Sequence, residues 1–126
     1  MINRRAAILL SLGIGAALEL GIQIATGRRE AWDSGLFWTV GLPVALLASF
    51  AVGAFTRGRN WIWTVVIAPA QVFTMMVRSV ELGGLWPLTL MLSAVLSAPF
   101  LFAAFVGTRF RGFVHSDARG TTTTRR

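Results

Sequence analysis

The sequence of 126 residues contains no cysteine, no lysine and a single histidine. Without cysteine the chain has no disulfide framework, no thiolate nucleophile and no cysteine-based metal site. His115 lies in a polar C-terminal stretch that offers no second ligand, so we predict neither a metal site nor a cofactor. Charged residues are also scarce. They make up 13% of the chain, whereas a soluble domain has about 25%.

The charge that is present is strongly basic. The net charge is +7, and all 12 basic residues are arginine. The arginines fall in short stretches between apolar runs, and no basic-aromatic groove pattern accompanies them, so we expect no nucleic-acid binding. Their positions indicate membrane orientation and contact with anionic lipid instead.

Four apolar runs are each long enough to cross a bilayer, which takes about 20 residues. They occupy residues 6–26, 35–55, 60–82 and 85–108. The short connections between successive runs make neighbouring spans antiparallel. We therefore predict an all-α membrane protein, in which residues 1–112 form a four-helix antiparallel transmembrane bundle. Residues 113–126 have no apolar periodicity and are predicted to form a polar, disordered cytoplasmic tail.

The arginines also predict an orientation. One side of the predicted bundle carries nine of them: Arg4, Arg5, Arg57, Arg59, Arg109, Arg111, Arg119, Arg125 and Arg126. The other side carries Arg28, Arg29 and Arg78. Because basic residues stay in the cytoplasm, both termini are predicted to be cytoplasmic in a multi-pass protein of the bacterial inner membrane.

Small residues recur at four-residue steps along three of the spans. Lipid gives no hydrophobic drive between helices, so such faces are typical of close helix packing. The predicted packing residues are Gly13, Ala17, Gly21, Gly41, Ala45, Ser49, Gly53, Ser93 and Ser97. Their partner is either another helix of the chain, a second copy, or a larger membrane complex. Pro43, Pro69 and Pro99 fall inside spans and predict helix kinks.

Glu19 is an acid within a segment otherwise suited to hydrocarbon, "AALELGIQIAT". Helical spacing puts it on one face with Ser11, Gly15 and Gln23. A similar stripe in the third span contains Gln71, Thr74 and Arg78.

A charge at membrane depth costs at least about 2.5–3.5 kcal/mol, so Glu19 needs a partner, a proton or water. We predict a buried Glu19–Arg78 ion pair, with Glu81 as a competing partner for Arg78. Two alternatives stay open. Glu19 is either a titrating carboxylate that takes a proton or cationic ligand, or an acid that serves a partner subunit.

Two resemblances bear on function. The stretch "AALELGIQ" resembles the first helix of the small multidrug resistance transporters, a family of four-span proteins. That resemblance implies that Glu19 exchanges protons for cationic drugs. The arginine bias and Arg78 depart from that family. The stretches "GRREAWDSGLFWTVGLP", "GGLWPLTL" and "LSAPF" are similar to small four-span bacterial inner-membrane proteins, which implies this architecture and no activity.

Catalytic groups are not evident in the predicted spans. They contain no histidine, no carboxylate pair at metal-ligand spacing and no Ser/His/Asp set, so we do not expect an enzyme. The preferred hypothesis is a structural or accessory membrane subunit with a buried polar centre. The alternative is a small oligomeric proton-coupled transporter or channel that uses Glu19, with Gln71 beside its path.

Overall fold

The computed structural model describes residues 1–28, 31–78 and 86–120. Within this part, four helical segments are long and apolar enough to cross a membrane: Arg4–Thr26, Phe37–Phe55, Gly58–Val77 and Pro87–Ser116. The predicted all-α fold with four membrane-spanning helices is therefore confirmed, and the structure is that of a multi-pass helical membrane protein.

The first span is a single helix, α1 (Arg4–Thr26), with a defined cap at each end. The side chain of Asn3 accepts the backbone N–H of Ala6 at 2.9 Å, which satisfies one of the free donors of the first turn. Gly27 ends the helix with a φ of 67°, a left-handed conformation that glycine adopts without steric cost.

The second span changes helix type before its proline. A short 3₁₀ turn, η1 (Ala31–Asp33), leads to a π-helical turn, η2 (Phe37–Gly41), and then to α2 (Leu42–Phe55). The N–H of Leu42 bonds the carbonyl of Phe37, five residues back. This wider turn directly precedes Pro43, whose ring would clash with a carbonyl in a regular α-helix.

The third span is a 3₁₀-helix, η3 (Gly58–Val66), that continues as α3 (Ile67–Arg78). Pro69 follows the change of helix type, and it lacks the N–H that an α-helix would direct to Val65. Where the sequence predicts kinks at Pro43 and Pro69, the structure has a change in helical winding beside each proline.

The fourth span, α4 (Trp86–Gly120), is longer than the sequence predicts. It passes through Pro99 without interruption and continues beyond residue 112, where we expected a disordered tail. An established helix lengthens at low cost because each added residue gains a hydrogen bond without new nucleation, and residues 113–120 contain no proline. The predicted tail therefore differs from the structure over residues 113–120, and residues 121–126 lie outside the described part.

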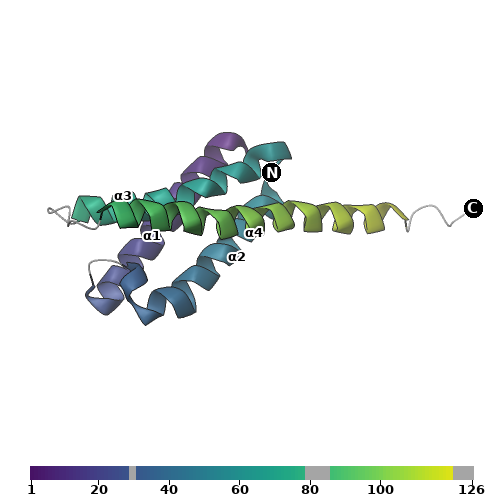
Figure 1. The fold of residues 1–126 in the computed structure, drawn as a ribbon. Coiled ribbons are helices and arrows are strands. Elements are labelled where there is room, and N and C mark those ends of the chain that lie inside the picture. The colour runs from purple at the N-terminus through teal and green to yellow at the C-terminus, as the bar shows by residue number, and fades with distance from the viewer. Residues whose placement is uncertain (29–30, 79–85, 121–126) are drawn as a thin grey trace, which may run out of the picture.

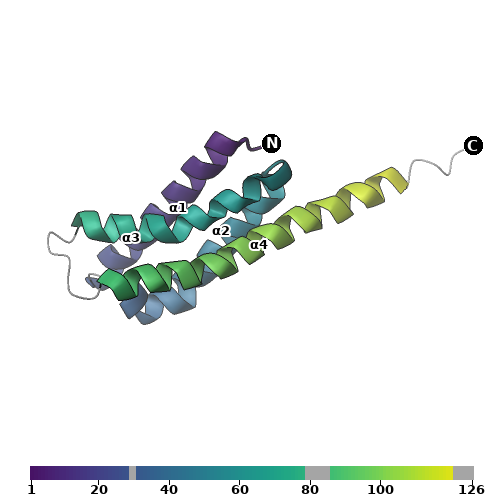
Figure 2. The same ribbon diagram turned by 45° about the horizontal axis from the view of Figure 1, so that its top comes forward.

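Successive helices run in alternating directions, as Figures 1 and 2 show. The C-terminal part of α4 extends beyond the other helices. The N-terminus meets the turn after α2, where the N–H of Ile2 bonds the carbonyl of Phe55 at 2.9 Å. The connection between α1 and α2 lies at the opposite end of the bundle.

Two close crossings hold the bundle together. Gly53 of α2 packs against the backbone of Ala104 of α4, and Gly107 of α4 packs against the backbone of Phe50. Gly15 of α1 packs against the carbonyl of Ile67 at the start of α3. A side chain at any of these glycines would collide with backbone, so the missing Cβ is what permits the approach.

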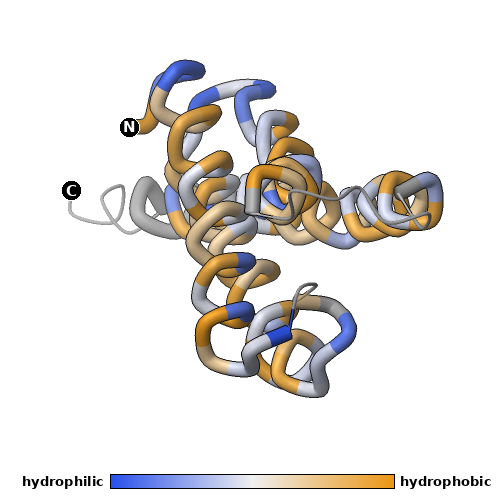
Figure 3. Tube along the Cα trace, turned by 90° about the vertical axis from the view of Figure 1, so that its left-hand side faces the viewer, coloured by the Kyte–Doolittle hydropathy of each residue, from blue (hydrophilic) through white to orange (hydrophobic). Residues whose placement is uncertain are grey.

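Large apolar side chains cover much of the outside of the bundle. Figure 3 shows hydrophobic residues along the lengths of the helices and hydrophilic residues gathered near helix ends and turns. The buried core is small: Ile22, Ala31, Phe37, Ala45, Ile67, Ala68, Leu96 and Phe100. An apolar exterior over an apolar core is what a hydrocarbon solvent requires.

Candidate functional site

The side chain of Glu19 is 1% exposed and lies about two turns from the end of α1. Its Oε1 atom accepts a hydrogen bond from Nε2 of Gln23 at 2.6 Å and from the backbone N–H of Ala31 at 3.2 Å. Gln23 sits one turn further along the same helix, whereas Ala31 opens η1 after the chain has turned back. The acid therefore joins α1 to the connection that follows it.

This connection is organised by local hydrogen bonds. Ser34 Oγ donates to the carbonyl of Ala31 at 2.7 Å and accepts the N–H of Phe37 at 3.2 Å. Ser34 thus caps the start of the second span. Asp33 pairs with Arg28 at 2.7 Å, but both side chains are largely exposed, so this ion pair contributes little stability.

Polar groups continue down the interface between α1 and α3. These helices run in the same direction from the contact of Gly15 with Ile67, so Gln71 lies at about the level of Glu19. Gln71 is 3% exposed, and its Nε2 atom has no hydrogen-bond partner in the described part of the chain. The same holds for Oγ of the fully buried Ser11. Thr74 is half-buried and donates to the carbonyl of Ala70.

The predicted ion pair of Glu19 cannot be followed in the structure. Arg78 is the last residue of α3, and its side chain lies outside what the structure describes, as does Glu81. The structure brings Glu19 and Gln23 into contact and places Gln71 and Thr74 on the neighbouring helix. The pairing of Glu19 with Arg78 stays a prediction.

The small-residue faces have different surroundings. On α2 and the turn before it, Gly41, Ala45, Ser49 and Gly53 are all buried, and so are Ser93 and Ser97 of α4. The face of α1 formed by Gly13, Ala17 and Gly21 is exposed, and a Cβ added at Gly13 or Gly21 would meet nothing within 4 Å. This last face is therefore not covered by the described part of the chain.

Three structural residues escaped the sequence analysis. Gly107 contacts the backbone of Phe50 at the α2–α4 crossing, but it does not belong to the four-residue repeats of small residues that include Gly53. Ala31 acts through its backbone N–H, which no side-chain pattern reveals. Arg111, considered only for its charge, donates to the carbonyl of Thr56 at 2.9 Å and so caps the end of α2.

The groups that the structure describes at this site offer hydrogen bonding and proton binding. Two of the buried serines are occupied within their own helices: Ser49 Oγ donates to the carbonyl of Ala45 and Ser97 Oγ donates to the carbonyl of Ser93, each at 2.8 Å. A hydroxyl bonded to its own helix and lacking an adjacent base is not activated as a nucleophile. The distinctive group is the carboxylate of Glu19.

No protein-family model matches the chain, and no curated protein or solved structure matches it either. The resemblances carried by "AALELGIQ" and "GRREAWDSGLFWTVGLP" accordingly stay predictions.

Proposed function

We propose that this chain is a non-enzymatic, multi-pass protein of the bacterial inner membrane that serves as a structural or accessory subunit. The observation that carries the proposal is the position of Glu19. Its carboxylate is buried and receives the N–H of Ala31, so it serves to fix the protein's own fold. An acid engaged in this way acts as an anchor between a helix and a loop.

The exposed face of α1 supports an associating role. Among the described glycines, Gly15, Gly53 and Gly107 contact the backbone of a neighbouring helix and Gly41 contacts the side chain of Ile22, whereas Gly13 and Gly21 are left open. A face of small residues allows another membrane helix to approach closely. The proposed partner is a helix of a larger membrane complex or of a second copy.

A second candidate function is proton-coupled transport through an oligomer. It is favoured by the polar groups buried between α1 and α3, where Gln71 Nε2 and Ser11 Oγ have no hydrogen-bond partner in the described residues. Buried polar groups within a membrane commonly mark ion or proton pathways. In this alternative, Glu19 would carry the proton.

Reconstitution distinguishes the two functions. Wild-type protein and Glu19→Gln would be placed in liposomes that contain a pH-sensitive dye, and a gradient of a lipophilic cation would be imposed. A structural subunit gives the same proton flux for both proteins, at the level of empty liposomes. Cation-driven flux that is lost in Glu19→Gln would replace the structural proposal with the transport alternative.

The associating role has its own test, helped by the absence of native cysteine. A cysteine introduced at Ala17 would be cross-linked in native membranes and compared with one at Leu47, an exposed position on α2. We expect a discrete cross-linked species with Ala17→Cys and not with Leu47→Cys. Equal cross-linking at both positions would mean random collision and would contradict the proposed interface.

A further inference from the structure

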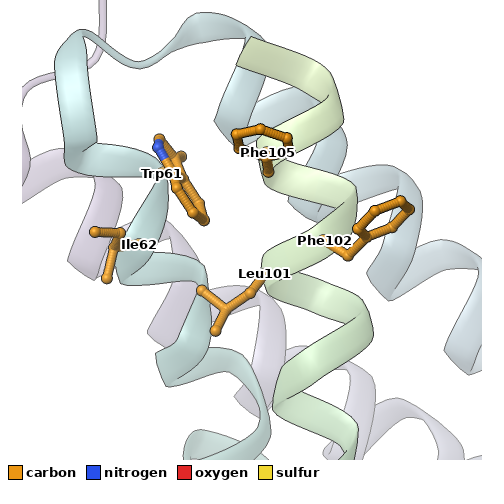
Figure 4. Close-up of a pocket in the computed structure, with 5 residues that line it drawn as sticks. All are labelled: Trp61, Ile62, Leu101, Phe102 and Phe105. Carbon is orange, nitrogen blue, oxygen red and sulfur yellow. The ribbon is translucent and has the colours of Figure 1, made fainter. Parts of the chain in front are cut away.

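A groove with an apolar lining lies between η3 and α4, near the end of the bundle that carries the N-terminus. Its volume is about 290 Å³. Figure 4 shows Trp61 and Phe105 reaching toward one another across it, with Leu101 below them. The rings of Trp61 and Phe105 meet edge to face with centroids 5.5 Å apart. The lining residues are Trp61, Ile62, Leu101, Phe102 and Phe105.

The lining decides what kind of molecule fills the groove. A bound water needs two to four polar partners, and the five lining side chains offer almost none. A helix with its side chains is about 10 Å across, so a whole helix could cover a groove of this volume but would not enter it. A hydrocarbon chain meets both conditions, because it is narrow and requires no hydrogen bonds.

Positive charge stands at one end of the groove. The guanidinium carbon of Arg109 lies 5.2 Å from the ring centroid of Phe105, one of the lining residues. Arg57, which directly precedes η3, and Arg59, in the first turn of η3, are both exposed and lie just before Trp61 in the chain. The acids whose side chains the structure describes lie at the α1–α2 connection, where Glu19 contacts Ala31 and Asp33 pairs with Arg28.

We propose that this groove binds one anionic phospholipid, with an acyl chain lying along the apolar lining formed by Trp61, Leu101 and Phe105 and the phosphate on Arg109. Arg57 and Arg59, at the start of η3, add electrostatic attraction for the anionic headgroup. Basic pockets between membrane helices recognise anionic headgroups in this way. The site is independent of the role of Glu19, because the groove and the polar cluster share no residue.

Quenching of tryptophan fluorescence tests the site directly. The protein would be placed in bilayers with increasing mole fractions of phosphatidylglycerol or phosphatidylcholine brominated on the acyl chain. The signal of Trp61 is the difference between the wild type and Trp61→Phe. We expect half-quenching of Trp61 at an about fivefold lower mole fraction of the brominated phosphatidylglycerol, the preference that one arginine near a membrane surface supplies.

Two variants that each remove one positive charge test whether the lipid preference depends on Arg109. Arg109→Ala removes the arginine beside the groove, whereas Arg5→Ala removes an exposed arginine of α1. Arg109→Ala should bring the two lipids toward equal quenching, and Arg5→Ala and Arg109→Lys should preserve the preference. Because Arg109 is exposed, these variants are expected to fold, and circular dichroism verifies it.

Three results would overturn the proposal. Equal quenching of wild-type Trp61 by both lipids would mean ordinary boundary lipid. An equal loss of preference in Arg109→Ala and Arg5→Ala would mean that general surface charge, and no defined site, attracts the lipid. Absence of quenching by either lipid would mean that protein, either a second copy or a partner helix, closes the groove.

Discussion

The backbone N–H of Ala31 donates a hydrogen bond to Oε1 of Glu19 over a distance of 3.2 Å, across a separation of 12 residues. The bond is buried, because Glu19 is 1% exposed and Ala31 is fully buried. It therefore links the chain's buried acid to the start of the second span. This link is the basis for treating Glu19 as part of the fold.

Replacing Glu19 with alanine should loosen the connection between α1 and α2. The change removes the acceptor for both Ala31 and Gln23, and a buried donor left without its partner costs about 1–3 kcal/mol. We expect hydrogen exchange at the Ala31 amide to accelerate by about tenfold or more in Glu19→Ala. Amide exchange measured in lipid nanodiscs gives this rate.

Two further variants separate the possible causes. Glu19→Gln keeps an oxygen that can accept from Ala31 and should show a smaller acceleration. Gln23→Ala removes one donor but leaves the bond from Ala31 to Glu19 in place, so exchange at Ala31 should change little. Unchanged exchange at Ala31 in Glu19→Ala would show that this bond does not protect the connection.

The sequence predicts the spans well, because their signal is the length of an apolar run, which a bilayer core demands whatever the tertiary packing. Local winding is harder to predict. The 3₁₀ form of η3 depends on how residues 58–66 fit against neighbouring helices, and hydropathy does not record it. Polar composition predicts disorder after residue 112, whereas α4 continues as a helix through residues 113–120.

The polar cluster was predictable only in part. Helical spacing put Ser11, Gly15, Glu19 and Gln23 on one face, and all four are buried. Spacing could not reveal that a backbone N–H would reach Glu19, since that contact depends on the path of the connection after Gly27. Helical spacing also does not distinguish the face of Gly13 and Gly21, which no described part of the chain covers, from the face of Gly53, which packs against Ala104.

Gly53→Ala should destabilise the bundle. An added Cβ would collide with the backbone of Ala104, so α2 and α4 would have to separate. Overpacking of this kind costs about 1–3 kcal/mol of the free energy of unfolding. Unfolding in mixed detergent micelles, followed by circular dichroism, measures the loss.

Gly21→Ala is the matched control for Gly53→Ala, because it makes the same chemical change in a helix. In the isolated chain, with no partner on this face of α1, a Cβ at Gly21 meets nothing within 4 Å, so only the higher helix propensity of alanine acts, worth up to about 1 kcal/mol in favour of the fold. The two substitutions should therefore change stability in opposite directions. Similar losses for both would argue against a close α2–α4 crossing at Gly53.

Arg111→Ala should release the end of α2. Its Nη1 atom donates to the carbonyls of Thr56 at 2.9 Å and Ala54 at 3.4 Å, groups that have no further helical turn to bond them. We expect faster amide exchange over residues 53–58 and a loss of about 1–2 kcal/mol in unfolding free energy. Arg109→Ala removes the same charge two residues away and should leave this segment unchanged. An equal effect of both variants would assign the result to net charge.

Orientation can be tested by labelling single cysteines, since the chain contains none of its own. Asp33 and Ser116 are both exposed, the first at the α1–α2 connection and the second on the extended part of α4. The positive-inside rule places the arginine-rich end in the cytoplasm. A membrane-impermeant maleimide should therefore label Asp33→Cys in intact spheroplasts and Ser116→Cys only after lysis. The reverse pattern would invert the predicted topology, and labelling of both cysteines in intact cells would mean that the chain inserts in two orientations.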